Sequence, residues 1–113
     1  MNLPRNIRRV FQSVFGPEGH APQALRAAAG NRATALCRPE PGESGVPPAL
    51  SAYVDKVSLT PYKVVDGDIE SLRASGLSED QIFELTVATA VGSARGRFEA
   101  VEALLATMDE DSK

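Results

Sequence analysis

The feature that most constrains this chain is a long helical pattern between Gly76 and Met108. Ser78 is a good N-cap residue, and Gln81 three positions later completes a capping-box pattern at the start of a helix. Apolar residues then recur at steps of three and four, which is the period of one helical face. These residues are Phe83, Val87, Ala90, Ala94, Phe98, Val101, Leu105 and Met108. We predict one long helix here and expect the rest of the chain to pack against it.

A second face of the same helix is built from small residues. Glu84, Ala88, Gly92 and Gly96 follow one another at steps of four. Each glycine inside a helix costs about 1 kcal/mol relative to alanine. Such a cost is usually offset when a neighbouring backbone packs too close to leave room for a side chain. We therefore predict a close backbone contact at the two glycines.

Shorter helices are predicted upstream, at residues 5–15, 22–37, 48–60 and 68–75. The first is amphipathic, and we favour docking on the core or on another subunit over binding to a membrane surface or a separate partner. In the second, Gly30-Asn31 marks a place where the helix could divide in two. No sustained alternation of apolar and polar residues predicts a strand. We expect an all-α fold, a helical bundle with one long C-terminal helix.

Residues 38–48 contain four prolines and two glycines, a composition that predicts a loop. Too few residues lie on either side of this loop to form two domains. We expect one domain over residues 1–113, with N-terminal helices and the loop in 1–48 and the helical core in 49–108.

The charge is distributed unevenly along the chain. Residues 1–38 carry six arginines against Glu18 alone, whereas the remainder is acidic and ends in Asp109, Glu110 and Asp111. A basic amino end can bind nucleic acid, and a regulator of that kind is our third hypothesis. The net charge of −3, the absence of Trp and the few aromatic residues argue against a nucleic-acid partner. We expect the basic end to meet acidic residues of its own or a neighbouring subunit.

Cysteine and hydropathy patterns bear on location and cofactors. No apolar run approaches the roughly 20 residues that span a bilayer, and the amino end lacks the apolar core of a signal peptide. Cys37 is the only cysteine, which favours a reducing compartment, and a catalytic pair with His20 is disfavoured because His20 lies in a Gly/Pro-rich segment. Asp66, Asp68 and Glu70 lack the further ligands of a calcium loop, and we expect N-capping of the helix at 68–75 instead. We expect a cytoplasmic protein with no membrane segment, no metal and no cofactor.

Two runs of residues carry a resemblance to a known family. They are YVDKV and VVDGDIESLRASGLSEDQIFELTVATAVGSARGRFEAV, in which a short helix ending in L-R-x-x-G precedes L-S-x-x-x-I-x-E-L and a long helix rich in small residues. Residues 53–105, about half the chain, resemble in this respect the carboxymuconolactone decarboxylase and alkylhydroperoxidase D (AhpD-like) superfamily. The resemblance implies an all-helical subunit that assembles as a homo-oligomer, commonly a dimer, trimer or hexamer.

The resemblance also implies a test of redox chemistry. Peroxidase members of that superfamily use a glutamate, then eleven residues, then Cys-x-x-Cys, then a histidine four residues beyond. Counted from Glu84, the two cysteine positions fall on Gly96 and Glu99, and the histidine position falls on Ala103. Only the glutamate is present, and a dithiol cycle within one subunit needs two cysteines. The resemblance therefore implies an AhpD-like protein without this redox centre.

Glu84 is the one candidate catalytic residue. It is either a base or anion-site partner near Arg95 and Arg97, or a structural acid in an ion pair at a subunit interface, and we favour the structural role. Our first hypothesis is a homo-oligomeric binding or accessory protein of unassigned role. The alternative is an enzyme, a decarboxylase or lyase for a small organic acid, with Glu84 and Tyr53, Tyr62 or Arg97 in an inter-helix pocket.

Overall fold

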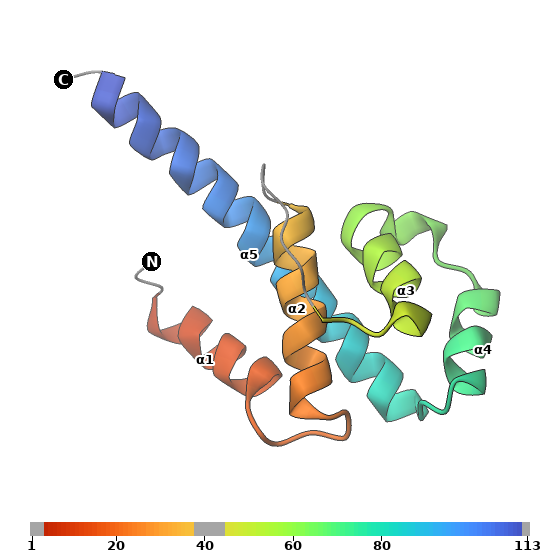
Figure 1. The fold of residues 1–113 in the computed structure, drawn as a ribbon. Helices are drawn as coiled ribbons and strands as arrows, with labels where there is room; N and C mark the ends of the chain where they lie inside the picture. Colours follow the sequence, from red (N-terminus) through yellow and green to blue (C-terminus); the bar gives the residue numbers. More distant parts are fainter. Residues whose placement is uncertain (1–3, 38–44, 112–113) are drawn as a thin grey trace.

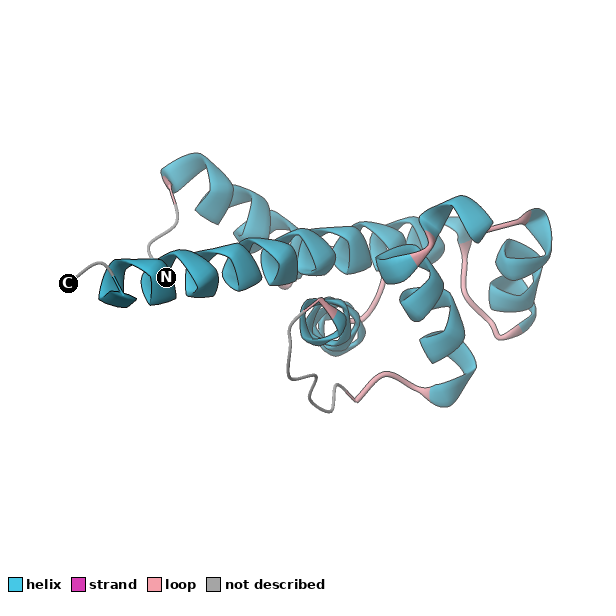
Figure 2. Cartoon of the chain, turned by 90° about the horizontal axis from the view of Figure 1, so that it is seen from above, coloured by secondary structure: helices cyan, strands magenta, loops and turns pink. Residues whose placement is uncertain are grey.

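The computed structural model describes residues 4–37 and 45–111, with side chains as far as residue 108. Over these residues the predicted all-α class is confirmed (Figure 1). The elements are α1 (Arg5–Phe15), α2 (Gln23–Leu36), α3 (Pro48–Leu59), the 3-10 turn η1 (Pro61–Lys63), α4 (Asp66–Ala74) and α5 (Glu79–Asp111). The described residues include no strand (Figure 2). Most of the predicted loop at 38–48 lies outside the described residues.

The turn from α4 into α5 is closed by two local motifs. Gln81 N–H donates to Ser78 Oγ at 3.2 Å, and Ser78 N–H donates to Gln81 Oε1 at 2.9 Å, so the predicted capping box is confirmed. Just upstream, Leu77 N–H donates to the Leu72 carbonyl at 3.2 Å, and Gly76 takes a φ of 103°. This is a Schellman-type ending, in which glycine adopts the left-handed conformation at little cost.

A hydrophobic core gathers α2, α3, α4 and the first half of α5 around one cluster. Its buried members are Ala29, Leu50, Tyr53, Val54, Leu72, Ile82 and Leu85. The Tyr53 hydroxyl lies 2.6 Å from Thr86 Oγ1, so the polar end of this large side chain has a hydrogen-bond partner. The core therefore occupies one end of an elongated molecule, whose extents are 56 × 28 × 23 Å.

α2 crosses α5 at close backbone distance. A β-carbon on Gly92 would lie 2.7 Å from Gly30 Cα, and one on Gly96 would lie 3.0 Å from Thr34 Cα. The Thr34 hydroxyl is 2.8 Å from the Gly92 carbonyl oxygen and thus adds a polar contact between the helices. The predicted close contact is confirmed, and α2 is the neighbour. Gly30 is a contact point inside one continuous helix, so the suggested division of α2 does not occur.

The large apolar side chains of α5 lie on another face. Six of them are 54–68% exposed: Phe83, Phe98, Val101, Leu104, Leu105 and Met108. The chain instead buries the face that contains Leu85, Ala88, Gly92 and Gly96. No described side chain after Gly96 is buried, so residues 97–111 project from the body as a helical arm (Figure 1). The spacing of the apolar residues predicted this helix correctly. The face that contacts α2, however, is set by the glycines and not by the large apolar side chains.

α1 packs on the body through its carboxyl-terminal end. A β-carbon on Gly30 would lie 2.7 Å from Phe15 Cζ, so the absence of a side chain there leaves room for the Phe15 ring. The Phe11 and Phe15 ring centres are 6.3 Å apart, and the Arg95 guanidinium carbon is 5.8 Å from the Phe11 ring centre. Toward its amino end α1 diverges from α5, as Figures 1 and 2 both show.

We expect Gly92→Leu to destabilise the fold, because its side chain would have to occupy the position of the α2 backbone. Overpacking of this kind costs about 1–3 kcal/mol, which corresponds to a melting temperature lower by roughly 5–15 °C. Thermal unfolding followed by circular dichroism measures the change. Ala103→Leu, at an exposed position of the same helix, is the matched control and should melt near the wild type. An unchanged melting temperature for Gly92→Leu would show that the close contact is wrong.

Candidate functional site

Glu84 faces the connection between α1 and α2, residues 16–22. One carboxylate oxygen accepts the His20 N–H at 2.8 Å and the Ala21 N–H at 3.2 Å, and the other accepts the His20 N–H at 2.6 Å. One turn earlier on α5, the Gln81 side-chain amide donates to the His20 carbonyl at 3.2 Å. The Glu84 side chain is only 18% exposed. Two side chains of α5 thus hold this connection by its backbone.

Arg26 of α2 supplies the positive charge beside Glu84. Its Nε lies 3.7 Å from the Glu84 carboxylate, and the residue is 2% exposed. The guanidinium also donates to the carbonyls of Ala21 at 3.1 Å, Val14 at 2.6 Å and Gly16 at 2.8 Å. A buried charge is tolerated when its hydrogen-bonding groups are satisfied in this way. Glu84 therefore binds N–H groups of the connection while Arg26 binds its carbonyl groups.

The arginines expected beside Glu84 lie elsewhere. Arg95 Nε donates to Glu99 at 3.2 Å, and Arg97 donates to the Ser58 carbonyl at 2.8 Å. Both follow Glu84 by about three helical turns, which is roughly 17–20 Å along the axis. Within one chain the expected grouping of these arginines with Glu84 is wrong, because the arginine that reaches Glu84 comes from α2.

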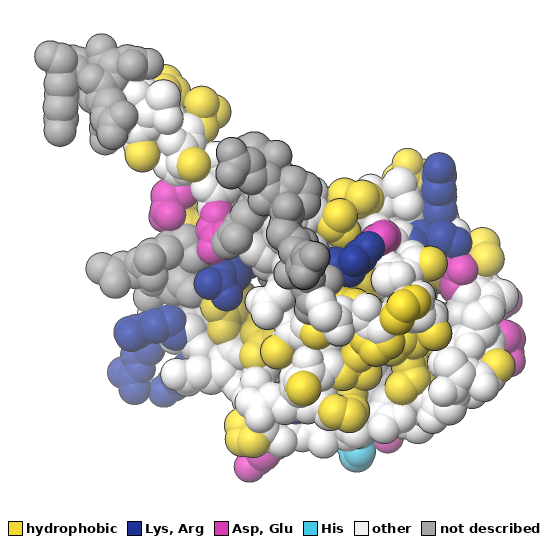
Figure 3. Space-filling view, viewed as in Figure 1, with side chains coloured by type: hydrophobic (Ala, Val, Ile, Leu, Met, Phe, Trp, Pro, Cys, Tyr) yellow, Lys and Arg dark blue, Asp and Glu magenta, His cyan; other side chains and the backbone are white. Residues whose placement is uncertain are grey.

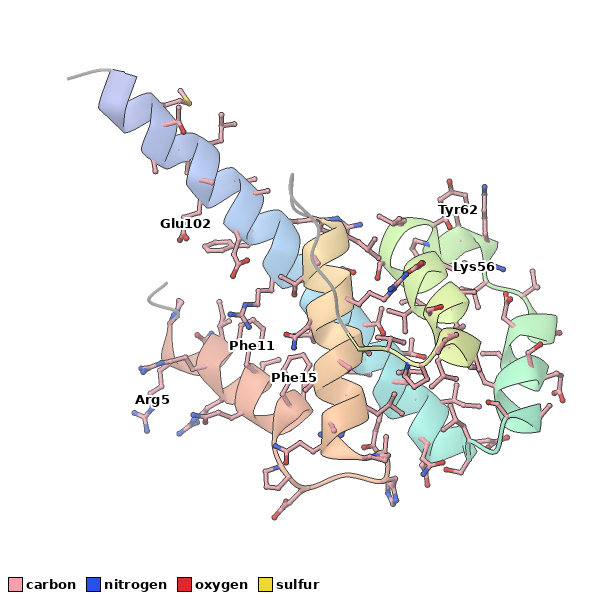
Figure 4. All side chains as sticks on the ribbon, viewed as in Figure 1. Arg5, Phe11, Phe15, Lys56, Tyr62 and Glu102 are labelled. Carbon is pink, nitrogen blue, oxygen red and sulfur yellow. The ribbon has the colours of Figure 1, made fainter. Side chains whose placement is uncertain are left out.

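The other expected site residues are also dispersed. Tyr53 belongs to the core, and Tyr62 in η1 is 80% exposed (Figure 4). His20 precedes α2 and Cys37 follows it, so the whole of that helix, about 20 Å, lies between them. His20 lies instead 3.9 Å from Asp80 in an exposed pair, and the structure does not bring the expected site side chains together with one another.

The surroundings of Glu84 stabilise its ionised form. Partial burial alone would raise the pKa of the carboxyl group. The N–H groups of His20 and Ala21 and the positive charges of His20 and Arg26 outweigh that effect, and the pKa falls below its ordinary value of 4.5. A carboxylate with a lowered pKa is a weak general base at neutral pH. Its environment suits an anchor for the connection better than a proton acceptor.

A cavity of about 190 Å³ lies next to Glu84. It is lined by Ser13, Val14, Glu18, Gly19, Arg26, Phe83, Glu84 and Val87. Sites for drug-sized ligands usually measure about 300–1,000 Å³, so this space suits only a very small molecule. Gly19 forms part of its wall with a φ of +154°, and a β-carbon there would lie 3.2 Å from Arg26 Cζ. The site thus depends on glycine at this position of the connection.

Asp68 has a structural partner on each side. It accepts the Val65 N–H at 2.8 Å at the start of α4, and Lys56 Nζ lies 3.0 Å from both of its oxygens. The hydrogen bond from Val65, followed by that from Lys56, lowers the pKa of Asp68 below its ordinary 3.8. The expected capping role is thus confirmed for Asp68, which acts from the third position of the helix; α4 begins at Asp66, two residues before the predicted start. Among the described side chains, no group of three or more His, Cys, Asp or Glu could hold a metal ion.

An apolar groove between α1 and α5 is a further feature that the sequence did not reveal. It measures about 380 Å³ and is lined by Pro4, Ile7, Val10, Phe11, Val91, Ala94, Arg95 and Phe98. The signal in the sequence was the apolar face of residues 5–15, which we had expected to dock on the core or on another subunit. The divergence of the two helices leaves part of that face open: Ile7 is 39% and Val10 49% exposed.

A scan against protein-family models gave no match, and searches of curated proteins and of solved structures gave none either. Within the described ranges, no helix combines the length and the apolar character needed to cross a membrane.

We expect Glu84→Gln to lower stability in a pH-dependent manner. The folded-state pKa of Glu84 is depressed, so its charge contributes stability that is complete above the ordinary pKa of 4.5 and is lost as the pH falls through the folded-state value. The difference in unfolding free energy between wild type and variant should therefore be largest near neutral pH and shrink in acid.

Denaturant titrations at several pH values measure this difference. Glu70→Gln is the control, because the Glu70 side chain is 67% exposed in a surface ion pair. A Glu84→Gln variant as stable as wild type at pH 7 would show that Glu84 does not anchor the connection.

Proposed function

We propose that this chain is an AhpD-like helical subunit that lacks a dithiol redox centre and works as a homo-oligomer in a binding or accessory role. The order of elements supports the AhpD-like assignment. A short α4 that ends at Gly76 leads directly into a long α5 that begins at the Ser78 capping box, as the resemblance implies.

The observation that carries the homo-oligomer is the exposed apolar face of the α5 arm. Its large side chains, Phe98, Val101, Leu104, Leu105 and Met108, are 54–60% exposed. Contiguous apolar surface of this kind usually marks an interaction site. A helical segment of only about 15 residues is also marginally stable in water unless its apolar face is packed. A partner on this face would stabilise the arm.

The absence of redox chemistry has physical support at each of the three motif positions. Gly96 is in backbone contact with α2, where a β-carbon would lie 3.0 Å from Thr34 Cα. Glu99 accepts a hydrogen bond from Arg95, and Ala103 is exposed. A cysteine at Gly96 would require α2 to move. The scaffold of this chain is therefore adapted to a small residue at that position.

The organic-acid enzyme remains the second candidate, supported by the cavity that Glu84 and Arg26 line. It is weaker because both oxygens of Glu84 already accept backbone N–H groups and Arg26 already binds three carbonyls. A substrate would have to displace these bonds. A nucleic-acid regulator ranks third; Arg5, Arg8 and Arg9 are exposed, but no further feature supports it.

We expect the wild-type protein to have at least twice the monomer mass in sedimentation equilibrium at micromolar concentration. Leu105→Glu should raise the dissociation constant at least about tenfold, because it would place a charge in the apolar contact. Ala103→Glu, two residues away on the other side of α5, should leave the mass unchanged. A wild-type monomer at about 100 µM would overturn the homo-oligomer proposal.

We also expect no peroxide reduction with a dithiol donor, because Cys37 has no second cysteine with which to form an intrachain disulfide. A coupled assay of peroxide consumption measures this rate, and Cys37→Ser should give the same background rate as wild type. Turnover well above the rate without protein would contradict the proposal.

A further inference from the structure

The exposed face of α5 has a seven-residue repeat. Val91, Ala94, Phe98, Val101, Leu105 and Met108 follow one another at steps of three, four, three, four and three. This spacing is that of the a and d positions of a coiled coil. A regular alternation of three and four corresponds to 3.5 residues per turn, the period of a helix that pairs with one other helix. In the described chain none of the six is buried, so this seam has no complete partner.

The seam is symmetric about a point between Phe98 and Val101. On either side of that point the next seam residues follow at steps of four and then three. In an antiparallel pair with a two-fold axis there, Phe98 lies opposite Val101 of the second copy, and Ala94 lies opposite Leu105. Each of these layers combines a larger with a smaller side chain. A parallel pair would place Ala94 against Ala94 and Phe98 against Phe98, which leaves a void in one layer and crowding in another.

The antiparallel arrangement also provides an occupant for the groove between α1 and α5. The arm of the second copy would run back along the first α5, past Phe98 and Ala94, which line the groove together with Ile7 and Val10 of α1. Leu105 and Met108 of the second copy are the apolar side chains that would enter it. Figures 1 and 2 show that α1 and α5 diverge toward the amino end of α1, which is the side from which the second arm would enter.

Charges on the flanks of the seam are complementary in this arrangement. Arg95 and Glu102 each follow a seam residue directly, and antiparallel pairing brings Arg95 of each copy beside Glu102 of the other. Glu102 points from α5 toward the side on which α1 lies (Figure 4). Arg95 already bonds Glu99 at 3.2 Å and would share its guanidinium between two carboxylates.

α1 carries positive charge beside the groove. Arg5, Arg8 and Arg9 are exposed, and Figure 3 shows a cluster of basic side chains on the side of the molecule where α1 lies. The second arm, which carries Glu102, would pass along this side of the groove.

Several large apolar side chains are available to the pair. Seven large side chains on this face are 39–60% exposed: Ile7, Val10, Phe98, Val101, Leu104, Leu105 and Met108. A second copy that covered them would remove a contiguous set of apolar side chains from water.

From these observations we infer that two copies of the chain pair antiparallel through α5, with the two-fold axis between Phe98 and Val101 and each arm seated in the α1–α5 groove of the other copy. The inference rests on the proposed homo-oligomer and identifies its interface. Such a pair is itself a dimer, and it also provides the two-fold contact of a hexamer.

Disulfide trapping between single-cysteine variants tests the arrangement. In a Cys37→Ser background, Ala94→Cys and Leu105→Cys are prepared separately with tags of different size, then oxidised alone and as a mixture. Both positions are exposed in the single chain, and circular dichroism checks that each variant is folded. The antiparallel pair should yield a mixed disulfide dimer only in the mixture, since only there do the two cysteines lie within bonding distance. Ala103→Cys mixed with Leu105→Cys is the control and should give no link.

The outcomes distinguish the antiparallel interface from the proposal that the chain is a homo-oligomer. Cross-linked dimers from each variant alone would indicate parallel pairing and overturn the inference. An oligomer in sedimentation that gives no mixed disulfide would also overturn it, while leaving the homo-oligomer in place. A wild-type monomer would remove both, and the apolar face would then belong to a different partner.

Discussion

The rest of the structure depends on the contact between the backbones of α2 and α5. Gly30, Gly92 and Gly96 allow the two helices to approach until no side chain fits between them, and Thr34 adds a hydroxyl at 2.8 Å from the Gly92 carbonyl. Because this contact uses the face of α5 that carries small residues, the large apolar side chains from Phe98 to Met108 are turned outward. The loss of helix propensity at the glycines is offset by dispersion contacts between two closely packed backbones.

The same crossing determines where α1 and its connection lie. The Phe15 ring packs where Gly30 has no side chain, and the connection that follows is held by Arg26 through its carbonyls and by Glu84 through its N–H groups. Two side chains of opposite charge thus hold a segment without regular structure. A carboxylate in such a position is ionised and largely shielded from solvent, as a catalytic group would be, but its oxygens are already occupied. The hydrogen bonds that Glu84 already accepts distinguish a structural role from a catalytic one better than its pKa does.

The exposed apolar surface lies on the outer face of the molecule rather than in the cavity beside Glu84. The space beside Glu84 is small, and Glu84 and Arg26 in its wall are already bonded. The α5 arm and the α1–α5 groove, by contrast, both expose large apolar side chains, and they share Phe98. A chain of this length has limited capacity to bury a core alone, and association with a second copy would add to it. In this protein the long helix would then serve both to support the core and to form the interface.

The sequence by itself determined the local features of this protein. The capping box at Ser78, the turn at Gly76, the helices and the need for a close neighbour at Gly92 all follow from short-range spacing and from the conformational properties of single residues. Only the tertiary structure decided that α2 is that neighbour, that Arg26 rather than Arg95 or Arg97 lies beside Glu84, and that the large apolar face of α5 stays open. These are matters of which distant segments meet. Periodicity shows that a helix has an apolar face, but it contains no information on which partner covers it.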